Sequence, residues 1–223
     1  MTFVEYPDRD MMMLALADKI AGQLGDFIRR EGWASLSVPG GTTPGQVFDV
    51  LSQVDLDWSK VAIFLNDERW VPESSPRSNT RLLRERLLVN RAAEATLVPL
   101  YGGAETPEEQ MEALGQGIAP HLPISVLLLG MGTDGHTGSI FPGADRLDEA
   151  LSPKAPILLP MRAPGAPEPR ITLSMPVLTA AMNMHILITG AEKRDALERA
   201  QKSDVIEAPV RGVLGNATVH WAE

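Results

Sequence analysis

Short apolar runs separated by amphipathic segments make up most of this chain. Three of the runs, Ala34–Val38, Val61–Leu65 and Ile124–Leu129, contain aliphatic residues and end at proline, a polar residue or glycine. Such short bounded runs predict buried strands. Further strands are predicted near Leu97–Leu100 and at Ile157–Leu159, Ile171–Ser174, His185–Thr189 and Ala217–Trp221.

Segments with apolar residues at helical spacing lie between most of these predicted strands. Thr106 followed by Pro107, Glu108 and Glu109 has the pattern of an N-cap, a first-turn proline and early acidic residues, which predicts a helix start. The predicted helices are about Asp8–Glu31, a short helix ending at Leu51, Asn79–Leu88, one from Thr106 to about Ile118, and Ala191–Gln201.

Repeated alternation of strand and helix predicts an α/β fold. We expect a Rossmann-like, mostly parallel twisted sheet with helices on both faces. The proline-rich segment Pro153–Pro169 is short and contains the apolar run Ile157–Leu159, which favours a rim loop with a short strand over a linker. The sequence therefore predicts a single domain over residues 1–223.

Composition narrows the class of partner. The chain has 20 basic and 29 acidic residues and a net charge of −9, which argues against nucleic acid or an anionic membrane as the main partner. A small anionic ligand stays compatible, because local arginines and backbone N–H groups can dominate one pocket. The absence of cysteine excludes thiolate chemistry and favours a cytoplasmic protein. The apolar run Met11–Ala17 is too short to span a membrane.

The glycine-rich segment 129–143 contains the strongest candidate for chemistry. It follows a predicted strand, where open α/β sheets bind ligands, and places five glycines around Asp134 and His136. The two side chains share a side in an extended segment, so the carboxylate can orient an imidazole suited to proton transfer. A structural histidine is the alternative. Metal binding is disfavoured, because the other histidines, His121, His185 and His220, are scattered along the sequence.

Three other segments predict anion binding. Gly40, Gly41, Thr42 and Thr43 lie between a strand and a helix and suit a phosphate cradle, although Thr42 or Thr43 as a plain helix cap explains them equally well. The run 66–70 follows another strand end and offers Asp67 or Glu68 as a base and Arg69 for a phosphate, with an ion pair inside the loop as the alternative. Candidates that add to this pocket are Asn79, Arg170 and Lys193.

Together these segments resemble the 6-phosphogluconolactonase family, which is related to the glucosamine-6-phosphate deaminases and isomerases. The resemblance covers nearly the whole chain and implies a NagB/RpiA-like fold. Deaminases follow the Asp-Gly-His turn with Phe-Asn-Glu-Pro, whereas this chain has Ser139-Ile140-Phe141-Pro142 and lacks that glutamate. The matching segments are Pro39–Pro44, Asn66–Pro72 with Ser78-Asn79, Leu129–Pro142, Pro169–Ser174 and Gly190–Lys193.

The resemblance implies hydrolysis of 6-phospho-D-glucono-1,5-lactone in the oxidative pentose phosphate pathway. His136 is then expected to act as general base and acid, with Asp134 orienting it or holding a sugar hydroxyl. No metal or cofactor is required, and either glycine-turn N–H groups or Arg69 stabilise the oxyanion. The residues expected to bind the substrate are Gly40, Gly41, Thr42, Thr43, Asp67, Arg69, Asn79, Arg170 and Lys193.

Two rival functions stay open at this point: an amino-sugar-phosphate deaminase or isomerase, and a non-catalytic sugar-phosphate sensor. The missing glutamate disfavours the first. The acidic net charge and the lack of a basic recognition helix disfavour a DNA-binding regulator. The expected partner is a small sugar phosphate, with neither nucleic acid nor membrane, and the sequence leaves the oligomeric state open, a monomer included.

Overall fold

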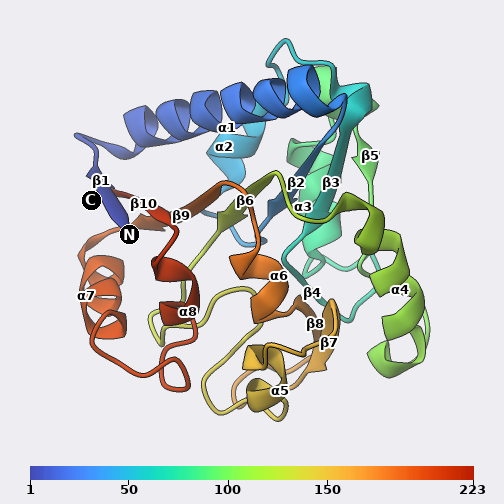
Figure 1. Ribbon diagram of the computed structural model, residues 1–223, viewed down its shortest axis with the longest axis vertical. Coiled ribbons are helices and arrows are strands. Elements are labelled where there is room, and N and C mark those ends of the chain that lie inside the picture. Colours follow the sequence, from blue (N-terminus) through green and yellow to red (C-terminus); the bar gives the residue numbers. More distant parts are fainter.

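A parallel sheet of seven strands runs through the molecule, and a small antiparallel sheet of three strands lies beside it (Figure 1). The computed structural model describes residues 1–223. The large sheet has the order β1-β10-β9-β6-β2-β3-β5, and the small one has the order β4-β8-β7. The strands are Thr2–Glu5 (β1), Ala34–Val38 (β2), Val61–Leu65 (β3), Asp67–Arg69 (β4), Thr96–Leu97 (β5), Val126–Leu129 (β6), Leu158–Met161 (β7), Arg170–Leu173 (β8), Met184–Thr189 (β9) and Thr218–Ala222 (β10).

Helices cover both faces of the large sheet, with α1 and α2 on one face and α6, α7 and α8 on the other (Figure 1). The predicted α/β class with a mostly parallel sheet is confirmed. The α-helices are Arg9–Glu31 (α1), Gly45–Leu51 (α2), Asn79–Arg86 (α3), Met111–Ile118 (α4), Leu147–Leu151 (α5), Met175–Thr179 (α6), Ala191–Ala200 (α7) and Arg211–Leu214 (α8). Short 3-10 turns occupy Trp58–Lys60, Asn90–Glu94, Pro107–Gln110 and Ala119–His121.

Helix α1 shows how the sequence pattern becomes a packed element. The Asp8 side chain accepts a hydrogen bond from the Met11 N–H (2.8 Å) and begins the helix, and Gly32, with φ of 81°, ends it. Its fully buried residues Met12, Leu16, Ile20 and Leu24 recur every four positions and pack on the sheet. None of the helices has both the length and the apolar character needed to span a membrane.

Several elements differ from the prediction. The polar run after β3 is not a loop throughout, because Asp67–Arg69 pairs with β8 as strand β4. The helix expected from Thr106 begins as a 3-10 turn and becomes α-helical at Met111. The strand expected near Leu97–Leu100 is limited to Thr96–Leu97, and the strand in the proline-rich segment is Leu158–Met161. The edge strand β1 and the short helices α5, α6 and α8 were not predicted.

Candidate active site

A cavity of about 250 Å³ opens at the carboxyl ends of β2, β6 and β9, beside the small sheet. This is the edge at which parallel α/β sheets bind ligands. Nine of the eleven predicted site residues line it: Gly40, Gly41, Thr43, Asp67, Arg69, Asn79, His136, Arg170 and Lys193. Of the other two, Asp134 contacts His136 from beside the cavity, and Thr42 is exposed on the loop without lining the wall.

The turn that carries His136 is fixed from several sides. Within it, the Gly132 N–H donates to the His136 carbonyl (2.9 Å). From outside it, the Val210 N–H donates to the Gly135 carbonyl (2.9 Å). Gly135 has φ of 82°, and a Cβ there would lie 2.7 Å from the Cβ of Ala208, so both backbone conformation and space require glycine. The segment after α7 therefore braces the turn from outside the cavity.

His136 and Asp134 form a hydrogen-bonded pair. Nδ1 of His136 lies 2.6 Å from Oδ1 of Asp134, which also accepts the His136 N–H at 3.1 Å. Burial opposes ionisation of Asp134, but its hydrogen bonds and attraction to His136 outweigh burial and lower its pKa. The imidazole stays 31% exposed, and with Nδ1 engaged, Nε2 is the nitrogen available for proton exchange. The Phe141 ring packs on the imidazole with centroids 4.4 Å apart.

Two arginines are neighbours on adjacent strands of the small sheet. Arg69 and Arg170 are directly opposed in the antiparallel pair of β4 with β8, and both line the cavity. Their Nε atoms are buried without a hydrogen-bond partner. Burial lowers the pKa of Arg170, and Asp67, 3.7 Å away, offsets part of that effect. Such incompletely paired guanidinium groups suit an anionic ligand.

Ser139 connects this arginine pair to the His136 turn. Its hydroxyl donates to Asp67 Oδ2 (2.5 Å) and accepts from Arg170 Nη1 (3.4 Å), and its N–H donates to the Thr172 hydroxyl (3.2 Å). The ion pair proposed within the 66–70 loop is wrong, because Asp67 pairs with Arg170 of another strand. Sequence reasoning missed this role of Ser139, since the contact depends on the β4–β8 register.

Lys193 adds a third cation at the start of α7. Its Nζ donates to the Met131 carbonyl (2.5 Å), which leaves further N–H donors for a ligand. Burial lowers the pKa of Lys193, and the negative charges of Asp134 and Glu192 oppose that shift. Three cations and one acidic side chain line the cavity, so its local charge is positive although the chain is acidic overall.

The loop between β2 and α2 forms another part of the cavity wall. Gly40 lies against the Asn79 side chain, in space that any side chain at position 40 would need. The alternative role of Thr42 or Thr43 as helix cap is wrong, because α2 begins after Pro44 without a side-chain cap. Thr43 is therefore free to contact a ligand in the cavity that it lines.

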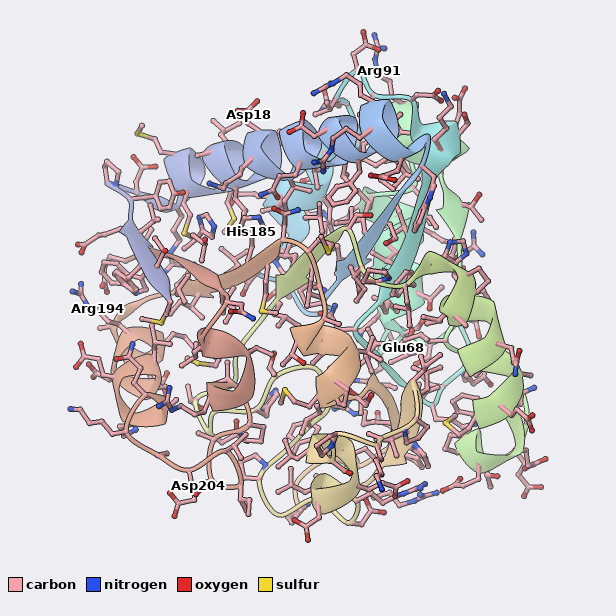
Figure 2. The ribbon with its side chains drawn as sticks, in the orientation of Figure 1. Asp18, Glu68, Arg91, His185, Arg194 and Asp204 are labelled. Atoms are coloured by element: carbon pink, nitrogen blue, oxygen red, sulfur yellow. The ribbon has the colours of Figure 1, made fainter.

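Two of the three remaining histidines, although scattered along the sequence, lie together in the fold. His185 of β9 and His220 of β10 are adjacent, with Nδ1 and Nε2 hydrogen-bonded at 3.0 Å, and both are buried. His185 also contacts Gln23 of α1 (2.8 Å), and His220 contacts the Tyr6 hydroxyl (2.8 Å). Figure 2 shows His185 beneath α1. Burial lowers the pKa of His185 to about 3 and that of His220 to about 4.

Comparison with known proteins places this architecture in a family. The family model of glucosamine-6-phosphate isomerases/6-phosphogluconolactonase matches residues 7–221, and the chain belongs to that family. A Rhizobium meliloti protein named 6-phosphogluconolactonase is 45% identical over 215 residues, covering 93% of each chain. A protein of the same name from Pseudomonas aeruginosa is 42% identical, covering 92% of this chain and 88% of its own.

Solved structures agree with this assignment. The crystal structure of a 6-phosphogluconolactonase from Shewanella baltica is 36% identical, with a TM-score of 0.96 over 100% of this chain and 97% of its own. A monomeric glucosamine-6-phosphate deaminase has a TM-score of 0.81 at 17% identity and covers 100% of this chain and 98% of its own. That likeness shows the shared fold alone, so the activity must be argued from the residues in the cavity.

Proposed function

We propose that this chain hydrolyses 6-phospho-D-glucono-1,5-lactone to 6-phospho-D-gluconate, the second step of the oxidative pentose phosphate pathway. The observation that carries the proposal is the His136–Asp134 pair on a cavity lined by three cations. Relatives at 45% and 42% identity bear the name 6-phosphogluconolactonase, which supports the same activity here. The cysteine-free composition favours a cytoplasmic enzyme.

In the proposed mechanism, Nε2 of His136 takes a proton from water as the water oxygen attacks the lactone carbonyl. Asp134 stabilises the resulting imidazolium through Nδ1. The imidazolium then protonates the ring oxygen as the carbon–oxygen bond breaks, which returns His136 to its neutral form. Acid–base assistance of this kind raises the reaction rate about 10²–10⁴-fold. The reaction as written uses no metal and no cofactor.

The cations divide two further tasks in this proposal. Arg170 and Lys193, with the 40–43 loop, bind the phosphate or the polar edge of the sugar. Arg69 stabilises the developing oxyanion, since its guanidinium lines the cavity and has a buried Nε without a partner. Asp67 and Asn79 complete the wall that contacts the sugar.

A coupled assay tests the proposal. Glucose-6-phosphate dehydrogenase generates the lactone, this protein acts on it, and 6-phosphogluconate dehydrogenase reports the product. We expect product formation well above the uncatalysed opening of the lactone. Ammonia release from glucosamine 6-phosphate is measured in parallel, and we expect none because Ser139, Ile140 and Phe141 stand in the segment where deaminases carry their glutamate. Ammonia release without lactone turnover would replace the proposed function with the deaminase alternative.

A further inference from the structure

Glu68 is the one side chain of strand β4 that is turned away from the cavity. Successive side chains of a strand alternate, so Asp67 and Arg69 face the cavity while Glu68 enters the interior. Glu68 is fully buried and forms no ion pair. A buried carboxylate without a counter-ion needs hydrogen-bond donors in its place.

Five donors surround this carboxylate. Oε1 accepts the N–H groups of Arg69 (2.8 Å) and Asn79 (2.9 Å). Oε2 accepts the N–H of Thr80 (2.7 Å), the Thr80 hydroxyl (2.8 Å) and the Ser78 hydroxyl (3.2 Å). Burial raises the pKa of Glu68 above its ordinary value, and the hydrogen bonds from Asn79 and Thr80 offset only part of that rise.

The two residues held through Oε1 meet again at the cavity wall. Arg69 Nη1 donates to Asn79 Oδ1 (3.3 Å), and Asn79 Nδ2 donates to the Asp67 carbonyl (3.3 Å). The Asn79 side chain also lies against Gly40 of the loop between β2 and α2. One buried carboxylate thus joins β4 to the start of α3 and sets the spacing of the side chains on that wall.

We propose that Glu68 is a positioning residue that fixes Arg69 for catalysis, directly and through Asn79, an inference that rests on the proposed lactone hydrolysis. A carboxylate is required because all five contacts are donors. A glutamine at this position retains one acceptor oxygen and turns an NH₂ group toward other donors. A role limited to capping α3 is the competing explanation. That helix already has a cap in Ser78, whose hydroxyl accepts the Arg81 N–H (3.2 Å).

A double-mutant cycle separates the two explanations. Glu68→Gln is made alone and together with Arg69→Met, and kcat and KM for the lactone are measured with the coupled assay. If Glu68 acts through Arg69, we expect Glu68→Gln to lower kcat about tenfold in the native background, as for the loss of one charge-assisted contact, and less than twofold in the Arg69→Met background. Equal losses of kcat in both backgrounds would overturn the positioning role.

Two controls keep the test decisive. Asp8→Ala removes a capping carboxylate remote from the cavity, and it should lower stability toward urea while leaving kcat unchanged. If Glu68→Gln does not fold, Thr80→Val removes one donor to Oε2 and enters the same cycle. We expect its smaller loss of kcat to depend on Arg69 as well, and a loss independent of Arg69 contradicts the proposal.

The same cycle distinguishes failure of this inference from failure of the proposed function. Affinity for 6-phosphogluconate is measured by calorimetry for each variant. A wild-type protein that binds the product but does not turn over the lactone refutes the proposed hydrolysis. Non-additive changes in Kd between Glu68 and Arg69 then still support positioning. Additive changes in Kd, or no binding by the wild-type protein, overturn the positioning role.

Discussion

Two hydrogen-bonded pairs, one of histidine with aspartate and one of two histidines, show how the surroundings of an imidazole determine its role. His136 is hydrogen-bonded to the carboxylate of Asp134, remains partly exposed and borders the cavity. His185 is hydrogen-bonded to His220, and both are buried beneath α1 with low pKa values. A charged partner and access to solvent suit the first ring to the proton transfer proposed for it. Burial beside a neutral partner keeps the second pair uncharged and makes it part of the core.

The largest expected effect is on the exposed pair. His136→Ala removes the proposed proton shuttle, so kcat for lactone hydrolysis should fall by about 10²–10⁴-fold, toward the uncatalysed rate. The coupled assay measures the loss, with circular dichroism confirming the fold. The matched variant His220→Gln should retain kcat, measured well below its unfolding temperature. The proposed difference between the two pairs is wrong if His136→Ala retains kcat or if His220→Gln loses it.

The next largest effect is expected from low pH, which should reduce the free energy of unfolding through the buried pair His185 and His220. Both folded pKa values lie below the ordinary histidine value near 6.5, so the unfolded chain binds more protons and stability falls as pH drops below about 6.5. Between pH 6.5 and pH 5 this amounts to about 2 kcal/mol for each histidine, at about 1.4 kcal/mol per pH unit. The loss levels off once pH passes below the folded values of about 4 and about 3.

Urea unfolding at pH 7 and pH 5 measures this difference. Other carboxylates also respond to acid, so the double variant His185→Gln with His220→Gln provides the reference, and its stability should change less between the two pH values. The imidazole signals of His185 and His220 in NMR should not titrate above pH 5. A variant as acid-sensitive as the wild-type protein would show that this pair does not control acid stability.

Asp134→Asn should have a smaller effect than loss of His136. The amide oxygen can still accept from Nδ1, but it lacks the negative charge that stabilises the imidazolium. The difference between a neutral and a charge-assisted hydrogen bond is about 1–2 kcal/mol, so kcat should fall about tenfold. The test is kcat at saturating lactone. A variant with full kcat would assign Asp134 to holding the turn rather than to stabilising charge.

The smallest effect is expected at the edge of the buried pair. Tyr6→Phe removes the hydroxyl that contacts His220 Nδ1 and should lower the unfolding free energy by about 1 kcal/mol. Urea denaturation monitors this change, and kcat should match that of the wild-type protein. A marked fall in kcat would mean that the buried pair is coupled to the cavity after all.

The sequence predicted elements whose signal is local. Strands β2 and β3 have the predicted bounds because each is a short buried run closed by proline or a polar residue. Strand β1 was missed because it is a four-residue edge strand, and β4 was missed because all three of its residues are charged. What makes β4 a strand is its pairing with β8, more than 100 residues later in the chain.

The candidate site divides in the same way. Glycine turns and polar residues after predicted strands indicated His136, Asp134 and the 40–43 loop, because strand ends converge at one sheet edge. The adjacency of His185 and His220 arises from the parallel register of β9 with β10, in which His185 is opposite Thr218 and His220 is opposite Leu187. No local pattern encodes that register. Ser139 likewise depends on a contact with Asp67, 72 residues away, and Glu68 on contacts with the start of α3.

The hydrogen bond from Val210 to Gly135 makes the proposed catalytic turn observable from a distant part of the chain. The Val210 amide proton can exchange with solvent only when that bond opens, and opening it releases the brace on the turn that carries His136. Lys193, at the start of α7, donates to the Met131 carbonyl. The glycine-rich segment that carries His136 is therefore held at a second point as well. The hydrogen-exchange rate of the Val210 amide therefore reports how often the proposed catalytic turn opens locally.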